Sequence, residues 1–244
     1  MPKLFSVALV GPDGSGKTTI SRRLRETLPL PIRYVYMGVN PESSNLMLPT
    51  TWLLNKVKRG LGAAPDTRGP RAIEDAVKPR PKNPVKRALF EVKSGLLLAN
   101  RIAEEWFRQA LTWLYTRRGY VVLFDRHFFS DYYAYDIAPT PYRKPWTRRL
   151  HGWMLLHLYP RPDLMIYLDA PAEVLLARKG EGTAEVLEDR RRAYLEMRAH
   201  VPHFVTVDAT QPEDAVLHQV TALILAFNRD RRVPASASEQ VTHA

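Results

Sequence analysis

Short runs of apolar residues alternate along this chain with longer segments in which apolar residues recur every three or four positions. The short runs predict buried strands at Leu4–Val10, Arg33–Tyr36, Tyr120–Phe124, Asp163–Leu168 and Phe204–Val207. The helical spacing predicts helices at Lys17–Leu28, Leu46–Lys58, Val85–Arg117, Pro171–Lys179, Ala184–Ala199 and Pro212–Phe227. Strands that alternate with helices predict an α/β fold of three layers, in which a parallel five-stranded sheet carries helices on both faces.

Two segments interrupt this pattern. Residues 60–84 are rich in glycine, proline and charge and are expected to form a loop. They lie in a basic segment, 56–93, which holds eleven Lys or Arg residues against four Asp or Glu residues. The end of the chain, 229–244, has no periodicity and is expected to be a disordered tail. One domain spanning residues 1–228 is therefore predicted.

Composition narrows the classes of function. The 244 residues include no cysteine, which excludes disulfides, thiolate metal sites and cysteine nucleophiles. No apolar run is long enough for a membrane span, and the first residues do not form a signal peptide, so a cytoplasmic protein is expected. The net charge of +11 favours anionic partners such as nucleotides, nucleic acid or acidic lipid.

The turn after the first predicted strand carries a phosphate-binding motif. Gly-Pro-Asp-Gly-Ser-Gly-Lys-Thr at 11–18 fits the P-loop pattern, in which main-chain N–H groups at a helix N-terminus surround phosphate oxygens. Lys17 is expected to reach the β- and γ-phosphates of ATP, and Thr18 to ligate Mg²⁺. The residues expected to bind ATP in this turn are Gly11, Asp13, Gly14, Ser15, Gly16, Lys17, Thr18 and Thr19. The patterns of GTPases and transporter ATPases are absent, which leaves kinases of small molecules.

A charged pair follows the third predicted strand. Asp125 at the end of that strand is expected to bind Mg²⁺ or its waters, because ligands of open α/β sheets lie at the carboxyl ends of the strands. Arg126 would point into the same crevice and bind a phosphate through two hydrogen bonds. The alternative is a salt bridge at the surface. For the neighbouring His127, packing or hydrogen bonding is favoured over proton transfer.

Two further basic positions are candidates. Arg178 precedes a glycine-containing hinge in segment 176–190, which is typical of a mobile lid that closes over a transferring phosphoryl group. A solvated charged turn is the alternative interpretation of this segment. Arg101 in the long predicted helix could meet the second substrate, although most helix arginines face water.

Taken together, these stretches resemble the thymidylate kinase family of nucleoside monophosphate kinases. The resemblance rests on the motifs at 11–19, 99–101, 124–127, 162–169, 178–181 and 207–209, together with Ser130 and Tyr135. It implies a P-loop kinase fold and the use of ATP and Mg²⁺. It also implies the following roles. Lys17, Arg126 and Arg178 would be catalytic; Asp208 and Ala209 would contact adenine; Asp13, Arg101, Asp125, Arg126 and Tyr135 would bind the acceptor; and Thr18 and Asp125 would hold the metal.

The acceptor side departs from the family pattern. Tyr-Val-Tyr-Met-Gly-Val-Asn-Pro at 34–41 replaces the family's Arg-Glu-Pro-Gly-Gly, Asp-Arg is followed by His127, and Asp136 stands where a Gln is usual. A dTMP-like monophosphate is the first expectation for the acceptor. A sugar or a nucleic-acid 5′ end in the same fold is an alternative, and so is a regulator that binds ATP without turnover. The family's homodimers make a second copy of the chain an expected partner.

Overall fold

The computed structural model describes residues 4–38, 46–60, 81–141, 143–180 and 183–231. Most of the basic segment predicted at 56–93, the hinge residues 181–182 and the tail from residue 232 onward lie outside these ranges.

A parallel sheet lies at the centre of the described part of the chain. Its strands are β1 Ser6–Val10, β2 Ile32–Tyr36, β3 Val121–Asp125, β4 Leu164–Asp169 and β5 Phe204–Asp208. They pair in the order β2-β3-β1-β4-β5, and every pairing is parallel. The predicted five-stranded parallel sheet is confirmed. The central strands β1 and β3 are buried throughout, which explains why their sequences are continuously apolar and do not alternate with polar residues.

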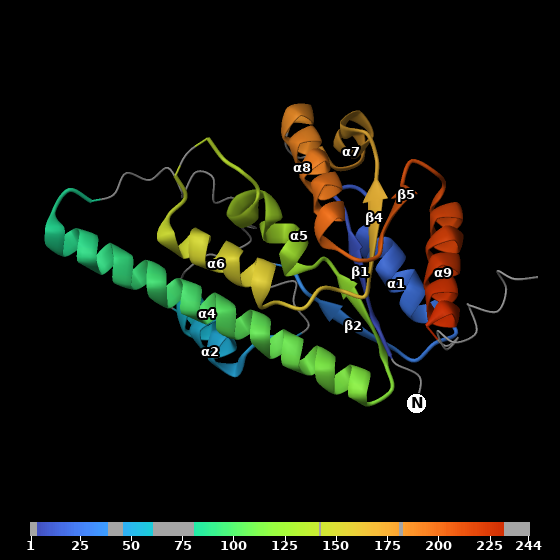
Figure 1. Cartoon of the computed structure of the whole chain (residues 1–244), viewed down its shortest axis with the longest axis horizontal. Coiled ribbons are helices and arrows are strands. Elements are labelled where there is room, and N and C mark those ends of the chain that lie inside the picture. Colours follow the sequence, from blue (N-terminus) through green and yellow to red (C-terminus); the bar gives the residue numbers. More distant parts are fainter. Residues whose placement is uncertain (1–3, 39–45, 61–80, 142, 181–182, 232–244) are drawn as a thin grey trace, which may run out of the picture.

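Helices cover both faces of this sheet, as predicted. Along β1, Val7 and Leu9 belong to one apolar cluster, whereas Ala8 and Val10 belong to another. Because successive strand residues point to opposite faces, the two clusters lie on opposite sides of the sheet. The first cluster includes residues of α1 Lys17–Thr27, α7 Ala172–Lys179 and α9 Glu213–Asp230. Figure 1 shows α1 and α9 together beside the sheet, on the side away from α4.

The longest helix, α4 Pro84–Arg117, has 34 residues and runs past the edge of the sheet (Figure 1). Its start is encoded locally. The Asn83 side chain accepts hydrogen bonds from the backbone N–H groups of Val85 and Lys86, and Pro84 occupies the first helical turn. The predicted bounds of this helix differ from the structure by one residue. The predicted helix at Leu46–Lys58 is shifted, and forms α2 Pro49–Gly60.

The segment between β3 and β4 contains elements that the apolar pattern did not predict. They are α5 Phe128–Tyr132, the π-helical turn η2 Tyr133–Ile137 and α6 Trp146–His157. Helix α6 packs against both η2 and α4. The helix predicted at Ala184–Ala199 is divided into α8 Ala184–Glu196 and the 3₁₀ turn η3 Met197–His200. Among the described helices, none has the length and apolar character that crossing a bilayer requires.

Candidate active site

The P-loop connects β1 to α1. Gly16 caps α1 in a left-handed conformation, and Gly14 has φ 91°. A Cβ on Gly14 would stand 2.9 Å from the carbonyl oxygen of Leu175, so both the torsion and the space exclude a side chain there. The turn can therefore follow the tight path that brings main-chain N–H groups together at the start of α1.

Lys17 is buried within this turn. Its Nζ donates a 2.6 Å hydrogen bond to the Pro12 carbonyl and a 3.4 Å bond to Ser15 Oγ. Burial and, to a lesser extent, the charge of Arg126 lower the pKa of Lys17 to about 8, against the opposing effect of Asp13 and Asp125. The charged form of this buried side chain is therefore costly in free energy, and an anionic ligand beside it would offset that cost.

Asp125 is the last residue of β3 and pairs with Leu9 of β1 and Tyr36 of β2. It therefore lies at the carboxyl ends of the strands, where the P-loop follows β1. Its Oδ2 accepts a 2.8 Å hydrogen bond from the Tyr34 hydroxyl. Its Oδ1 is buried and has no hydrogen-bond partner among the described residues. A buried carboxylate oxygen without a partner fits a hard cation such as Mg²⁺.

The other expected metal ligand, Thr18, is exposed in the first turn of α1. In the described parts of the chain, no three Asp, Glu or His side chains gather into a group that could hold a metal. Mg²⁺ is commonly bound by one or two protein groups together with substrate phosphates and water. A hydroxyl and a carboxylate are groups that can hold Mg²⁺ together with a nucleotide, so Thr18 and Asp125 stay predicted ligands.

Arg126 turns back toward the P-loop. It is a non-glycine residue with φ 66° in the described chain, and its Nη2 lies 2.5 Å from Asp13 Oδ1. Burial raises the pKa of Asp13, but the opposing effects of Arg126 and Lys17 are larger in sum and lower it to about 2. A left-handed arginine costs about 1–2 kcal/mol, and such strain is concentrated at functional sites.

A second arginine reaches the same carboxylate. Arg190 Nη1 of α8 lies 3.5 Å from Asp13 Oδ2. Three arginines follow one another here, Arg190, Arg191 and Arg192, a charge run that by itself favours a solvated helix face, with lid involvement as the alternative. Only Arg192 matches the solvated face, pairing with Asp189 at the surface, whereas Arg191 bonds both oxygens of Asp169 at the end of β4.

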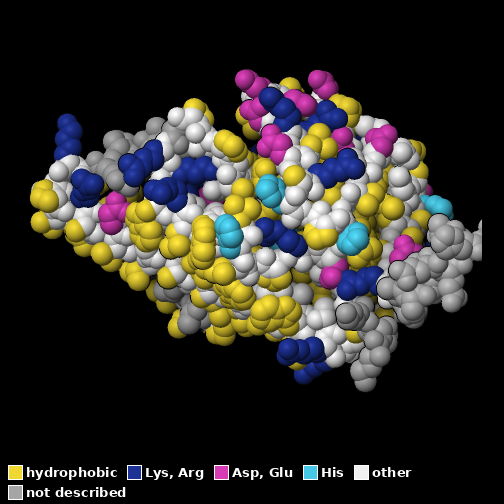
Figure 2. Space-filling view, in the orientation of Figure 1, with side chains coloured by type: hydrophobic (Ala, Val, Ile, Leu, Met, Phe, Trp, Pro, Cys, Tyr) yellow, Lys and Arg dark blue, Asp and Glu magenta, His cyan; other side chains and the backbone are white. Residues whose placement is uncertain are grey.

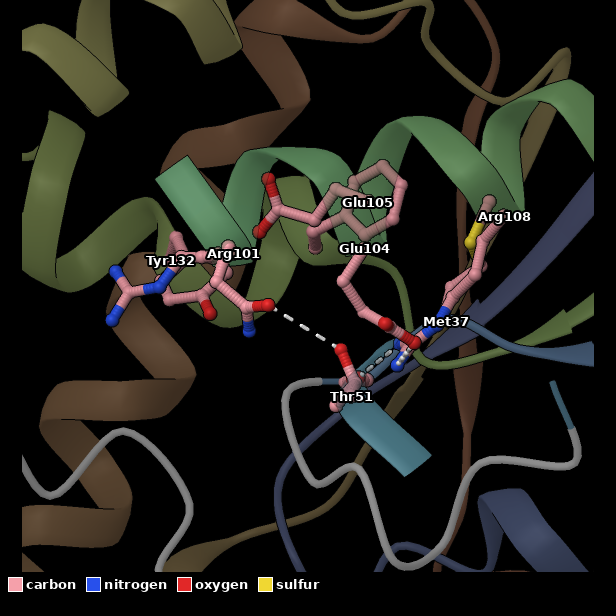
Figure 3. A pocket seen from close by; sticks show the side chains of 10 residues that line it. Met37, Thr51, Arg101, Glu104, Glu105, Arg108 and Tyr132 are labelled. Carbon is pink, nitrogen blue, oxygen red and sulfur yellow. Dashed lines mark hydrogen bonds and ion pairs between the residues drawn. The ribbon is translucent and has the colours of Figure 1, made fainter. Parts of the chain in front are cut away.

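A cavity of about 80 Å³ opens beside Arg126, between α4 and the chain that follows β2. Arg101, Glu104, Glu105 and Arg108 of α4 line it, and Figure 3 shows Glu104 and Arg108 extending toward Thr51, whereas the guanidinium of Arg101 extends away from Thr51. The predicted acceptor residue Arg101 thus lines this space, and its guanidinium lies 4.9 Å from the Tyr132 ring centre.

Tyr135, the other expected acceptor residue on this side, does not line the cavity. It lies in η2, where the guanidinium of Arg148 is 5.8 Å from its ring centre. His127 is buried and caps α5 by accepting from the Phe129 N–H, which confirms the structural role predicted for it. Burial and, to a lesser extent, the charge of Arg161 lower the pKa of His127 to about 3.

Several polar residues of the cavity wall were not predicted from the sequence. Glu104 pairs with Arg108 at 3.0 Å and accepts from the Leu48 N–H, while Arg108 also donates to the Gly38 carbonyl. Glu105 is bonded to His151 of the unpredicted helix α6. The i, i+4 spacing of Glu104 and Arg108 on an expected helix is the one feature that could have indicated their pairing.

On the side predicted to bind ATP, Arg178 lies in the last turn of α7 and donates a 2.8 Å hydrogen bond to the Ala209 carbonyl. Asp208 accepts from both the N–H and the hydroxyl of Thr210, which fixes the turn after β5. The structure therefore joins Arg178 to the predicted adenine-binding turn, while Arg190 approaches Asp13 in the P-loop.

Known proteins resemble this chain over nearly its whole length, although no family model matches it. A probable thymidylate kinase of Methanosarcina mazei is 27% identical over 233 residues, covering 91% of this chain and 95% of that protein. The thymidylate kinase of Xanthomonas euvesicatoria pv. vesicatoria is 27% identical over 92% of this chain and 85% of its own. A probable thymidylate kinase of Methanoculleus marisnigri is 29% identical over 93% of this chain and 97% of its own. With this coverage and the 2-3-1-4-5 parallel sheet, the chain is a distant homologue of these thymidylate kinases and has the fold of P-loop nucleoside monophosphate kinases.

Proposed function

We propose that this protein is an ATP-dependent kinase that transfers the γ-phosphoryl group of ATP to the phosphate of a nucleoside monophosphate similar to dTMP. The observation that carries the proposal is the arrangement around Asp13. Its carboxylate in the P-loop binds Arg126, which directly follows Asp125 at the end of β3, while Lys17 lies inside the same loop. A phosphate-binding loop and a second cationic group beside it are what transfer between two phosphates requires.

In this proposal each group of the chain has a role at one end of the transfer. Lys17 and the main-chain N–H groups of residues 11–18 bind the β- and γ-phosphates, and Asp208 and Ala209 contact adenine. Arg126 binds the acceptor phosphate, and Asp13 keeps that guanidinium in position. Thr18 and Asp125 would hold Mg²⁺, which supplies positive charge against the phosphate oxygens when it is bound.

The chemical step is an in-line displacement. An oxygen of the acceptor phosphate forms a bond to the γ-phosphorus as the bond to the β-phosphate oxygen breaks, giving ADP and a diphosphate. No covalent enzyme intermediate is involved, so positioning and charge neutralisation provide most of the acceleration. Arg178 is the proposed lid arginine, and its contact with Ala209 supports a place on the ATP side. The approach of Arg190 to Asp13 supports a second cationic role nearer the P-loop.

The same proposal includes self-association and a cytoplasmic location. Large apolar side chains are exposed along α4 and α6, among them Leu89, Leu96, Leu97, Trp113, Leu150 and Trp153. Figure 2 shows hydrophobic side chains gathered along this side of the molecule. Exposed apolar surface of this kind is common where two proteins meet, which supports a second copy of the chain as the partner.

The test is release of ADP from ATP in the presence of a panel of nucleoside monophosphates and sugar phosphates, with Lys17→Ala as the control. We expect ADP release that depends on one acceptor class, and its loss in the Lys17→Ala protein. The absence of ADP with every acceptor would contradict the proposal and favour a regulator that binds ATP without turnover.

A further inference from the structure

The cavity near Arg126 is lined by two residues with buried polar atoms that have no hydrogen-bond partner among the described residues. In the described part of the chain, Glu105 Oε1 and Arg108 Nε are buried without a hydrogen-bond partner, and both residues line this cavity. Glu105 has only 4% of its surface exposed. A buried acceptor atom without a partner is costly, so native proteins rarely leave one unless a ligand or water completes it.

The other oxygen of Glu105 is firmly held. Its Oε2 accepts hydrogen bonds from the Tyr159 hydroxyl at 2.7 Å and from His151 Nε2 at 3.0 Å. His151 Nδ1 lies 2.7 Å from Asp136 Oδ2, so the imidazole bridges two carboxylates. Burial alone would lower the pKa of His151, but these two hydrogen-bonded carboxylates raise it to about 9. Because Oε2 is fixed from two sides, the direction of Oε1 is fixed as well.

The cavity lies close to the proposed phosphate position. Gly38 lines it, and a Cβ on Gly38 would stand 2.8 Å from Arg126 Cδ, so the Arg126 side chain packs against a residue of the cavity wall. A molecule whose phosphate is bound by Arg126 would therefore place its other end among Arg101, Glu105 and Arg108. Arg101 and Arg108 Nε can donate hydrogen bonds to that end, and Glu105 Oε1 can only accept one.

We propose that Glu105 selects the acceptor by accepting a hydrogen bond from an N–H or O–H group on the end of the molecule opposite its phosphate. This inference rests on the proposed function, because it assumes that an acceptor phosphate occupies Arg126. The donor is either a nucleobase N–H or a sugar hydroxyl. Masking that donor would leave Glu105 Oε1 buried and unpaired, which weakens binding about tenfold to a hundredfold for a charge-assisted bond.

The experiment compares the binding of matched acceptor pairs by calorimetry, without ATP and without turnover. For the nucleobase arm the pairs are dTMP with its N3-methyl derivative, and dCMP with 2-pyrimidinone deoxyriboside monophosphate, which lacks the amino group. For the sugar arm a hexose 1-phosphate is compared with its O-methylated form. In the wild-type protein we expect one arm to bind, with the donor-bearing member tighter by about tenfold or more.

The variant Glu105→Gln keeps the shape but changes the chemistry. Its amide oxygen would face Tyr159 and His151, which places the NH₂ group where Oε1 was, so the preference for the donor-bearing member should vanish or invert. The matched control Tyr159→Phe keeps Oε1 in place and should keep the preference. Thermal unfolding shows whether each variant is folded, and the wild-type ratio alone tests the proposal if Glu105→Gln is not.

Three results would overturn the inference: no panel member binds, the wild-type protein does not distinguish the pairs, or Glu105→Gln keeps the wild-type preference. ADP release is measured separately with the acceptor that binds. Binding with the expected preference but without ADP release would contradict the kinase proposal and leave this inference standing. ADP release together with a preference that Glu105→Gln does not change would contradict this inference and leave the kinase proposal standing.

Discussion

Arg126 Nη2 lies 2.5 Å from Asp13 Oδ1, which joins two residues that are 113 positions apart in the sequence. The pair connects the P-loop after β1 to the end of β3. Each strand ends at the same edge of the sheet because β1 and β3 are parallel neighbours in which Leu9 pairs with Asp125. The left-handed backbone of Arg126 directs its side chain back across that edge. One ion pair therefore links the proposed ATP-binding loop to the proposed acceptor phosphate site.

Replacing Arg126 should weaken binding of the acceptor far more than binding of ATP. In Arg126→Ala, we expect KM for the acceptor to rise about tenfold to a hundredfold, because a charge-assisted contact to phosphate is lost. The affinity for ATP should change by less than about threefold, since Lys17 and the loop N–H groups remain. Steady-state kinetics in both substrates and a separate ATP titration measure the two effects. Equal losses for ATP and acceptor would show that Arg126 does not belong to the acceptor side.

Arg190 and Arg192 offer a matched comparison on α8. Arg190 approaches Asp13, whereas Arg192 pairs with Asp189 at the surface. We expect Arg190→Ala to lower kcat by about tenfold or more, because a cation near the transferring group is removed. Arg192→Ala should leave kcat within about twofold, as surface ion pairs contribute little. The comparison uses single-turnover rates with both substrates saturating. Equal rates in the two variants would show that Arg190 does not contribute to the transfer step.

The lowered pKa of Lys17 predicts proton uptake when ATP binds. Lys17 has a pKa of about 8 in the structure, mainly through burial, so part of the population is neutral at pH 8.5. Phosphate oxygens favour the charged form, and binding should therefore take up a fraction of a proton at pH 8.5 and close to none from this group at pH 6.5. Calorimetry in buffers with different ionisation enthalpies counts the protons. Lys17→Arg, which stays charged, should show no such difference between the two pH values.

His151 should make stability depend on alkaline pH. Its pKa is raised from 6.5 to about 9 because Asp136 and Glu105 outweigh the effect of burial. A raised pKa in the folded state gives stability that is full below about pH 6.5 and is lost as pH rises through about 9. Chemical denaturation from pH 6 to 10 should show a decline on the order of a few kcal/mol from this group. In His151→Gln this decline should shrink, and an unchanged profile would mean that the bridged imidazole does not titrate in this range.

The fold was largely predictable because the buried strands and amphipathic helices follow simple periods. Strand β1 reads as an apolar run because both of its faces are covered, and α4 carries its own capping signal in Asn83 and Pro84. The segment from Phe128 to His157 was not predicted. Its aromatic residues follow no single period, since α5 continues into a π-helical turn before α6 begins.

The candidate site was predictable where function depends on local sequence. The P-loop and the Asp125–Arg126 pair are continuous motifs, so their residues could be named without a structure. The Arg190–Asp13 approach depends on how α8 packs over the P-loop. The Glu105–His151–Asp136 network depends on α6, an element absent from the predicted set. Contacts that join three distant segments leave no spacing in the sequence that would reveal them.

The most direct test of the account is a titration of Mg·ATP into the protein, because every proposed role depends on the turn at 11–18 enclosing a polyphosphate. We predict saturable binding to the wild-type chain, weakened by about tenfold or more in Lys17→Ala, since a buried cation that contacts phosphate contributes on the order of 1.5–3 kcal/mol. A wild-type protein without measurable affinity for any nucleoside triphosphate would contradict the account, as would a Lys17→Ala protein that binds equally well.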